Sequence, residues 1–324
     1  VDPEDLKVKI SERTKVIMVV PMLGGSSKIG EIMEVVRNVN NSRKKENLSK
    51  IFVLEDCAQS LGAHAFGIPG SSQTSLPEGC YKLGTFGDIG TFSLQLNKDI
   101  TAGEGGMVVT RDKELNDRVD ALHNAGYIKK EKNNINWYGD IPYGWGHGRR
   151  MSELQGAVAR VQLKKLDSIL DNIRKNHSFF EEFFKKQGIK LRKRAYQNNP
   201  GDTGYYLCFH LPENLDDNTA ISKGREIAKD LKDKGFNVWF LHDFEVHIYY
   251  NIEPLVKKFP MNDGSPWEDP KNSFHTQYKY DRGALPNLDH LLIRTIGLNM
   301  PSKMSDNTRD NMMNDLLVTL KNLY

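Results

Sequence analysis

The sequence predicts an α/β protein: a mixed, mostly parallel sheet with crossover helices, followed by a smaller α+β domain. In the first half, short β-branched runs alternate with helical patterns, which is typical of βαβ units. The second half contains long helical stretches and fewer strand-like runs. A length of 324 residues with 38% hydrophobic content suits two cores. We therefore expect a large domain over residues 1–167 and a small domain over residues 168–324, which includes the linking helix.

The first elements form one predicted βαβ unit after a helix-like opening, DPEDLKVKI. VIMVVPM, residues 16–22, is expected to be a buried strand that begins near Thr14, and KIFVLED, residues 50–56, a second one. Between them, residues 29–39 place their apolar side chains on one helical face, which predicts an amphipathic helix. Those side chains are Ile29, Ile32, Val35, Val36 and Val39.

The later elements follow the same signals. A Gly-, Pro- and Ser-rich stretch at residues 67–83 predicts a surface loop or hairpin insertion, and the polar, aromatic stretch at residues 129–149 predicts a long ordered loop. Ser152 and Gln155 form a capping-box pattern that starts a long helix running toward Phe179. The remaining predicted strands are GDIGTFSLQL, GGMVVT, GYYLCFHLP and FNVWFL, and the remaining predicted helices cover residues 112–125, 218–234 and 305–323.

Composition excludes several classes of function. The formal net charge of +3 is close to balance, so we expect neither nucleic-acid nor membrane-surface binding. No run has the apolar length of a membrane helix, and the amino terminus lacks a signal or transit pattern. Three scattered cysteines, Cys57, Cys80 and Cys208, indicate no disulfide framework or thiolate metal site. We expect a cytoplasmic protein that acts on small molecules without a metal.

Several polar residues are expected to meet at the carboxyl ends of the strands, where open α/β sheets bind ligands. Asp56 ends one predicted strand, Gln59 follows it by three residues, and Ser93 ends another. Lys98 comes five residues after Ser93, before a run in which Gly103, Gly105 and Gly106 permit close backbone approach.

This combination predicts a pyridoxal phosphate site. A lysine becomes a nucleophile only when its amine is neutral, and burial beside a cationic cofactor lowers its pKa. In this hypothesis Lys98 forms the Schiff base, Asp56 holds the protonated ring nitrogen, and Ser93 binds phosphate. Taken singly, each feature also has an ordinary explanation: a solvated loop lysine at position 98, a helix N-cap at Asp56, a strand hydroxyl at Ser93 and a plain turn for the glycines.

Three segments carry a resemblance to a known family. They are EDCAQSLGAHAFG, KLGTFGDIGTFSLQLNKDITAGEGGMVVT and RRMSELQGAVARVQLKKLD. They resemble motifs of the DegT/DnrJ/EryC1/StrS sugar aminotransferases, which have the fold type I pyridoxal-phosphate architecture. The similarity extends from Asp2 to about Asp167.

The resemblance implies roles for individual residues. Lys98 would be the Schiff-base lysine, Asp56 the partner of the pyridine nitrogen, Gln59 a contact to the cofactor ring, and Ser93 a phosphate ligand. Lysine at position 98, where sugar dehydratases of the family carry histidine, implies transamination. The implied reaction transfers an amino group from an amino acid, glutamate or glutamine, to a keto sugar in amino-sugar or cell-surface polysaccharide biosynthesis.

Two departures separate this chain from the family pattern. Gly148 stands where the family commonly has an asparagine that reaches the phosphate of the neighbouring subunit, and Arg149 or His147 is the candidate substitute. The family's amino-terminal segment, with a phosphate turn and a ring-stacking aromatic, has no counterpart here. An alternative is therefore a truncated, noncatalytic partner subunit. A lysine-dependent aldolase would share the imine but gives no reason for Asp56 and Ser93.

The substrate side is predicted more coarsely. WYGDIPYGWGHGRR and LHDFEVHIYYN are rich in aromatic and basic groups, which suit a hydroxylated ring with phosphate or carboxylate. His247 is a candidate substrate contact, or a packed structural histidine. HIYYN with GSPW faintly resembles enzymes that aminate an eight-carbon 3-deoxy sugar acid, and nucleotide-linked sugars stay equally open. The resemblance also implies a homodimer with Arg149 or Arg150 near the partner's cofactor.

Overall fold

A computed structural model describes most of the chain as two compact units. The described residues are 1–66, 80–127, 143–195, 201–270, 272, 278–321 and 323. The first unit comprises residues 1–174 and 193–205, and the second comprises residues 175–192 and 206–324. The predicted domain boundary at Asp167 falls inside helix α4 (Glu153–Lys186) and stays a prediction. Of the two expected loops, at residues 67–83 and 129–149, residues 67–79 and 129–142 lie outside the described residues.

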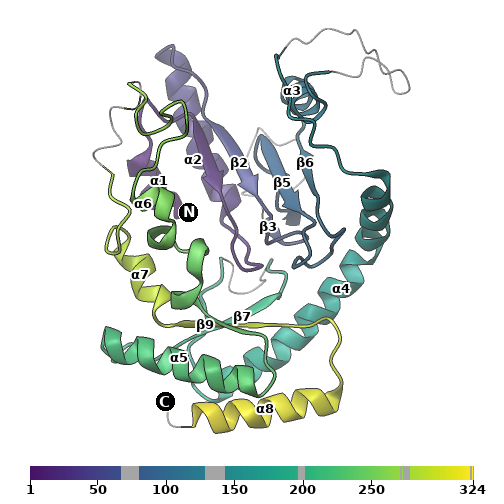
Figure 1. Ribbon diagram of the computed structural model, residues 1–324, viewed down its shortest axis with the longest axis vertical. Helices are drawn as coiled ribbons and strands as arrows, with labels where there is room; N and C mark the ends of the chain where they lie inside the picture. Colours follow the sequence, from purple (N-terminus) through teal and green to yellow (C-terminus); the bar gives the residue numbers. More distant parts are fainter. Residues whose placement is uncertain are drawn as a thin grey trace. The chain divides into compact units, whose positions relative to one another are not determined.

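A four-stranded sheet forms the centre of the first unit (Figure 1). Its order is β1-β2-β5-β6, in which β1, β2 and β5 are parallel and β6 is antiparallel to β5. The strands are β1 (Val16–Val19), β2 (Phe52–Asp56), β5 (Ile89–Ser93) and β6 (Gly106–Val109). The predicted mixed, mostly parallel sheet of an α/β fold is thereby confirmed.

Helix α2 (Ile29–Lys45) covers one face of this sheet and completes the predicted βαβ unit. Ile29 and Ile32 are fully buried and share a cluster with Val19 of β1 and Val53 of β2. The helix runs six residues beyond the predicted end at Val39. Its last turns are anchored by a buried arginine and not by further apolar side chains. Arg43 is buried, and its guanidinium donates hydrogen bonds to the carbonyls of Ser11, Glu12 and Ser49.

The other face of the sheet is apolar and open in the described part of the unit. Val16, Met18 and Phe52 are 55%, 50% and 38% exposed, whereas their neighbours Ile17 and Val53 on the opposite face are buried. The alternation follows from the two-residue period of a strand.

The other elements of the first unit surround this sheet. The short strands β3 (His64–Phe66) and β4 (Cys80–Lys82) pair as an antiparallel ribbon at the ends of the expected insertion. Helix α1 (Pro3–Lys9) is capped by Asp2, and α3 (Lys113–His123) by Asp112. At the start of α4 the predicted capping box is confirmed, because the backbone N–H of Gln155 donates to Ser152 Oγ at 3.2 Å and the Ser152 N–H donates to Gln155 Oε1 at 2.9 Å.

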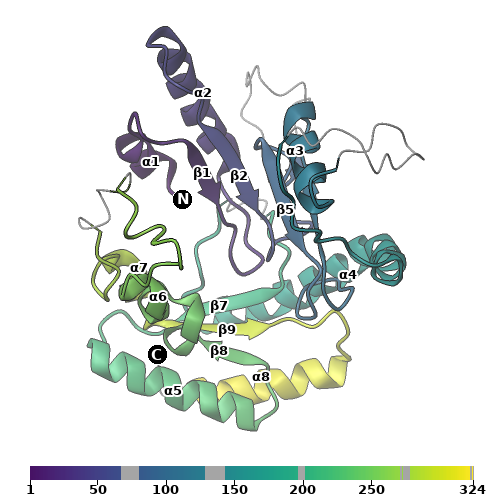
Figure 2. The same ribbon diagram turned by 45° about the horizontal axis from the view of Figure 1, so that its top comes forward.

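The second unit is a three-stranded antiparallel sheet with helices on it (Figure 2). Its order is β7-β9-β8, with β7 (Tyr206–His210), β8 (Val238–Phe240) and β9 (Thr295–Asn299). Helix α5 (Asp217–Asp233) packs on β8, β9 and α8 (Asp306–Leu320). The shorter elements are η1 (Leu241–Asp243), η2 (Glu245–His247), η3 (Tyr249–Asn251), α6 (Glu253–Val256) and α7 (Pro286–Leu292).

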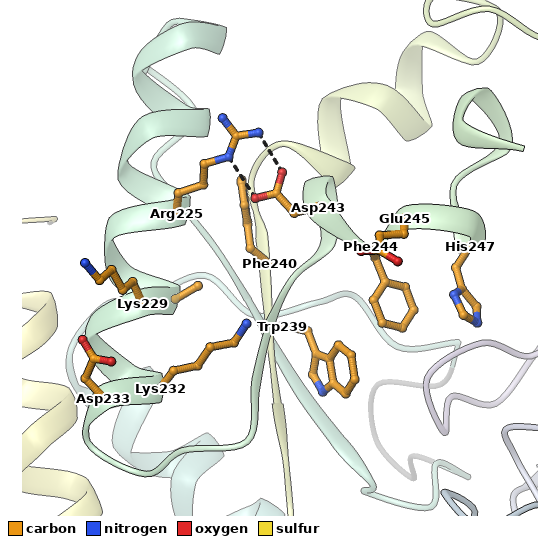
Figure 3. Close-up of a pocket in the computed structure, with 11 residues that line it drawn as sticks. Arg225, Lys229, Lys232, Asp233, Trp239, Phe240, Asp243, Phe244, Glu245 and His247 are labelled. Carbon is orange, nitrogen blue, oxygen red and sulfur yellow. Dashed lines mark hydrogen bonds and ion pairs between the residues drawn. The ribbon is translucent and has the colours of Figure 1, made fainter. Parts of the chain in front are cut away.

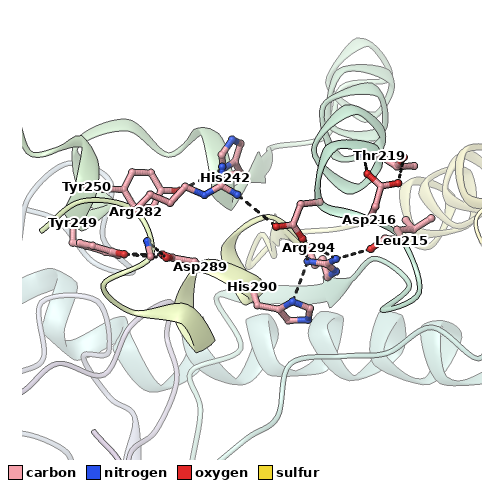
Figure 4. Close-up of polar contacts among 12 residues, drawn as sticks. Leu215, Asp216, Thr219, His242, Tyr249, Tyr250, Arg282, Asp289, His290 and Arg294 are labelled. Carbon is pink, nitrogen blue, oxygen red and sulfur yellow. Dashed lines mark hydrogen bonds and ion pairs between the residues drawn. The ribbon is translucent and has the colours of Figure 1, made fainter.

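Buried polar contacts join these elements (Figure 4). Arg294 lies just before β9 and is 4% exposed. It donates to the Leu215 carbonyl at 2.6 Å, to Asp217 at the start of α5 at 3.2 Å, and to His290 Nδ1 at 3.1 Å. Arg294 thus holds the end of α7 and the start of α5 to the central strand. None of the helices in the described part of the chain has the length and apolar character needed to cross a bilayer.

Candidate active site

Asp56 and Ser93 lie on the same face of the sheet at one edge. Asp56 is the last residue of β2 and pairs in register with Thr91 of β5, and Ser93 follows Thr91 by two residues at the end of β5. Side chains in register, or two residues apart, point to the same face. Because β2 and β5 are parallel, both strands end at the same edge of the sheet. The strand register therefore places these two residues as the sequence analysis expected.

Lys98 ends a turn that follows β5 directly. The Lys98 N–H donates to the Gln95 carbonyl at 3.1 Å, and the Tyr205 hydroxyl donates to the Asn97 carbonyl at 3.0 Å. Lys98 is half-buried, and within the described residues its amine makes no hydrogen bond or ion pair. The turn therefore fixes the backbone of Lys98, and the amine stays available to bind a ligand.

The polar atoms of Asp56 and Ser93 are only lightly used by the protein. Asp56 Oδ1 accepts a hydrogen bond from the Ala58 N–H at 3.1 Å, and Ser93 Oγ accepts one from the Gln95 N–H at 3.3 Å. Asp56 has no ion pair within the described residues. It begins a turn rather than the helix that an N-cap explanation required. A half-buried carboxylate without a cation is suited to bind one from a ligand.

Gln59 holds the loop that follows β1. Its Oε1 accepts a hydrogen bond from the Leu23 N–H at 2.9 Å, and its carbonyl accepts one from the Gly24 N–H at 3.0 Å. Gly24 has φ +69°, and a Cβ there would lie 2.4 Å from Thr203 Oγ1. Gln59 thereby fixes this tight loop beside the site, and its predicted contact to a cofactor ring stays a prediction.

Glu55 is a site residue that the sequence reasoning missed. It precedes Asp56 and points to the opposite, covered face of β2, where it is fully buried. Its carboxylate accepts hydrogen bonds from three backbone N–H groups at the turn before β5, those of Gly84 at 2.8 Å, Phe86 at 2.7 Å and Gly87 at 2.7 Å. Burial raises the pKa of Glu55, and these hydrogen bonds and Arg111 lower it. Glu55 thus fastens β2 to the turn that leads into β5.

The glycines after Lys98 are required by backbone geometry. Gly105 has φ +146°, and a Cβ there would lie 2.9 Å from Met151 Sδ. A Cβ on Gly106 would lie 2.6 Å from the Phe92 carbonyl oxygen. Gln155 of α4 also donates to the Glu104 carbonyl at 3.0 Å. The glycines are therefore needed for close packing against β5 and the start of α4, and an ordinary turn alone does not explain them.

His147, Arg149 and Arg150 lie in an exposed segment before α4. Within the described residues, no hydrogen bond or ion pair joins them to Lys98 or Asp56. Gly148 has φ +61°, and a Cβ there would meet only the Ala125 methyl at 4.0 Å. Asparagine is among the residues that tolerate this conformation best, so the backbone is compatible with the residue found in the resembling family.

His247 lines a cavity of about 560 Å³ in the second unit (Figure 3). Its ring lies 4.5 Å from that of Phe244, which in turn packs edge-on against Trp239 at 5.0 Å. Figure 3 shows Lys232 of α5 extending toward Trp239, and the ion pair between Arg225 and Asp243 on the same wall. The cavity thus combines aromatic faces with charged groups of both signs.

The fold and these motifs define a family. The sequence matches the DegT/DnrJ/EryC1/StrS aminotransferase family over residues 1–260. The chain belongs to this family.

Relatives agree with this assignment. The chain is 36% identical over 170 residues to GDP-perosamine synthase of Escherichia coli O157:H7, a match that covers 52% of this chain and 38% of that protein. It is 26% identical to the spore coat polysaccharide biosynthesis protein SpsC of Bacillus subtilis, over 97% of this chain and 68% of that protein. The fold is similar to a putative sugar aminotransferase of Streptococcus pneumoniae, Spr1654, in its PLP form, with a TM-score of 0.71 and 18% identity over 100% of this chain and 72% of that one.

Proposed function

We propose that this chain is a pyridoxal-phosphate-dependent aminotransferase that transfers an amino group from glutamate or glutamine to a keto sugar. The observation that carries the proposal is the common edge of the sheet at which Asp56 and Ser93 face the same side, with Lys98 five residues after Ser93. Family membership supports the same conclusion.

The residues at this edge fit the cofactor chemically. Asp56 is a half-buried carboxylate without a cationic partner in the described residues, which suits a protonated ring nitrogen. Ser93 has a hydroxyl suited to phosphate, and Lys98 has an amine free of ion pairs among the described groups. When bound, pyridoxal phosphate supplies an electron sink for the carbon that loses a proton.

Each residue would then have a separate task. Lys98 would hold the cofactor and, once released, would move a proton as a general acid and base. Asp56 would keep the ring nitrogen protonated. Glu55 and Gln59 would act indirectly, by positioning the backbone around the cofactor, because their hydrogen bonds fix the turns beside the site.

The sugar is proposed at the level of class. A nucleotide-linked sugar is favoured, because GDP-perosamine synthase is among the relatives. A sugar acid is the alternative. The cavity at His247 is lined by Lys232, Arg225 and aromatic rings, which suit an anionic group in the second unit. A cytoplasmic location is part of this proposal, since Cys57 and Cys208 are buried free thiols and burial raises the pKa of Cys57.

The test is the reaction of the purified chain with pyridoxal phosphate. We expect a visible absorbance band that borohydride abolishes, and a covalent adduct that mass spectrometry places on Lys98. Addition of glutamate or glutamine should bleach the band before reduction. A protein that binds no cofactor, or binds it at another lysine, would contradict the proposal.

A noncatalytic partner subunit is the second candidate, and one observation favours it. The open apolar face at Val16, Met18 and Phe52 adjoins Asp56, so a further polypeptide would bury that face beside the site. This candidate predicts no adduct on Lys98 in the isolated chain, and an adduct only after a complementary subunit is added.

A homodimer is also proposed. Leu154, Val158 and Val161 form an apolar stripe on α4 that is 81%, 48% and 50% exposed, and Trp145 before it is 94% exposed. Self-association would bury this stripe next to Arg149 and Arg150. Light scattering should give twice the monomer mass, and Val158→Glu should shift the protein to monomer. A wild-type monomer at micromolar concentration would contradict the proposal.

A further inference from the structure

A segment that is distant in sequence holds the turn that carries Lys98. Residues 201–205, here called the return segment, come after α4 in the chain and belong to the first unit. The Tyr205 hydroxyl at the end of this segment donates to the Asn97 carbonyl at 3.0 Å. Asn97 is joined directly to Lys98, so this hydrogen bond acts on the backbone from which the Lys98 side chain extends.

The other hydrogen bonds of this turn are local. The Lys98 N–H donates to the Gln95 carbonyl at 3.1 Å, and the Asn97 N–H donates to Gln95 Oε1 at 2.8 Å. Such bonds shape the turn but do not position it against the rest of the protein. In the described part of the chain, the hydrogen bond from Tyr205 is the one that ties residues 95–98 to a segment distant in sequence.

The return segment is itself fixed by burial and hydrogen bonds. Thr203 is fully buried; its N–H donates to the Gly24 carbonyl at 2.8 Å, and its Oγ1 accepts the Tyr205 N–H at 3.2 Å. Asp202 is buried as well, and its Oδ1 accepts the Ser26 N–H at 2.7 Å. Tyr205 therefore has a fixed base from which its hydroxyl reaches the turn.

The same segment also reaches Gln59. The Gly24 N–H donates to the Gln59 carbonyl at 3.0 Å, and the Gly24 carbonyl accepts the Thr203 N–H. Thr203 is thus linked through Gly24 to Gln59, whereas Tyr205 is linked to the turn of Lys98. The return segment therefore connects the turn after β2 with the turn after β5, which are the two parts of the candidate site that precede and carry the lysine.

We propose that Tyr205 is a positioning residue for Lys98, whose hydroxyl holds the turn where the lysine amine reaches the cofactor. This inference rests on the proposed function, in which Lys98 holds pyridoxal phosphate. Reaction rates fall steeply when a reacting group is misplaced. The net contribution of one ordinary hydrogen bond corresponds to about 2- to 12-fold in a rate or equilibrium constant.

The first test needs no cofactor. Hydrogen exchange is followed by mass spectrometry in Tyr205→Phe, which removes only the hydroxyl. Exchange of the Asn97 and Lys98 amides should rise by about 2- to 12-fold, because both are hydrogen-bonded within the turn that loses its anchor. A peptide from β2 should exchange as in the wild type. Unchanged exchange at the turn in folded Tyr205→Phe would overturn the inference.

Tyr81→Phe is the matched control. Tyr81 lies on β4, its ring packs edge-on against Phe86 at 5.9 Å, and its hydroxyl makes no hydrogen bond within the described residues. Loss of this hydroxyl should change neither the exchange at the turn nor the reaction of Lys98 with the cofactor. A rise in exchange equal to that of Tyr205→Phe would contradict a specific role for Tyr205.

The second test separates positioning from binding. In Tyr205→Phe, the rate at which pyridoxal phosphate forms the borohydride-sensitive band should fall by about 2- to 12-fold. The affinity for pyridoxine phosphate should stay at the wild-type value, because its alcohol replaces the aldehyde and cannot bond covalently to Lys98. An equal loss for both ligands would show that Tyr205 only maintains the shape of the site, which would overturn the inference.

Thr203 provides a second pair of variants if Tyr205→Phe does not fold. Thr203→Ala and Thr203→Ser both lose the methyl group, but only Thr203→Ser keeps the hydroxyl that accepts the Tyr205 N–H. Exchange at the turn should rise in Thr203→Ala and stay near the wild-type value in Thr203→Ser; equal exchange in the two would overturn the inference. A wild type that binds no cofactor would count against the proposed function and leave the exchange result intact.

Discussion

Replacing Lys98 by alanine is expected to abolish the borohydride-sensitive absorbance and to lower the amination rate by about 10²–10⁴-fold or more, since that range covers the loss of general acid–base catalysis alone. The physical reason is that the half-buried amine on the turn after β5 has no substitute at this site in the described part of the chain. The measurements are the spectrum with pyridoxal phosphate and the rate with an amino donor and a keto sugar.

Stability separates a chemical effect from a structural one. The Lys98 amine makes no ion pair or hydrogen bond within the described residues. The free energy of unfolding of Lys98→Ala, measured with urea, should therefore equal that of the wild type within about 0.5 kcal/mol. Lys9→Ala, at an exposed position in α1, is the matched control and should keep both spectrum and rate. Full activity in Lys98→Ala would remove the basis of the proposed function.

Glu55→Gln is expected to lower stability and Asp56→Asn to lower the amination rate, although the two residues are adjacent. Glu55 is buried and accepts three backbone hydrogen bonds, and the amide group of the Glu55→Gln variant would point N–H donors at N–H donors. We expect Glu55→Gln to lower the free energy of unfolding by about 1–3 kcal/mol, the usual cost of an unsatisfied buried polar group.

Asp56→Asn should leave the free energy of unfolding within about 0.5 kcal/mol, because an amide oxygen still accepts the single hydrogen bond from Ala58. The neutral amide no longer stabilises a protonated ring nitrogen. The amination rate should therefore fall by about 10²–10³-fold, the size typical of losing one preorganised electrostatic contact.

Each variant of this pair is the control for the other. Urea unfolding followed by circular dichroism gives the stability, and the amination rate at saturating pyridoxal phosphate gives the chemistry. If Asp56→Asn destabilised the fold as much as Glu55→Gln, the carboxylate of Asp56 would be structural. If Asp56→Asn kept the wild-type rate, the proposed role for Asp56 would be wrong.

Local patterns predicted much of the fold. The helix over residues 29–39 was recognisable from its apolar stripe, and the observed α2 buries Ile29 and Ile32 of that stripe. Ser152 and Gln155 identified the start of α4, because a capping box depends only on residues three apart. Strand β9 was missed, since five residues between two antiparallel neighbours are defined by pairing partners distant in sequence.

The candidate site divides in the same way. Lys98, Asp56 and Ser93 were selected from residue type and spacing, and these features determine which chemistry the chain has available. The sequence did not reveal that Glu55 fastens the turn before β5, or that Gln59 holds the loop after β1.

By itself, the sequence determined the alternation of strands and helices and the identity of the reactive groups, because both follow from local periodicity and side-chain chemistry. Only the tertiary structure decided which side chains share a face and which polar atoms have partners. Strand register and burial set these properties, and both depend on contacts between residues far apart in the chain, such as Asp56 with Thr91 and Arg174 with Gly62.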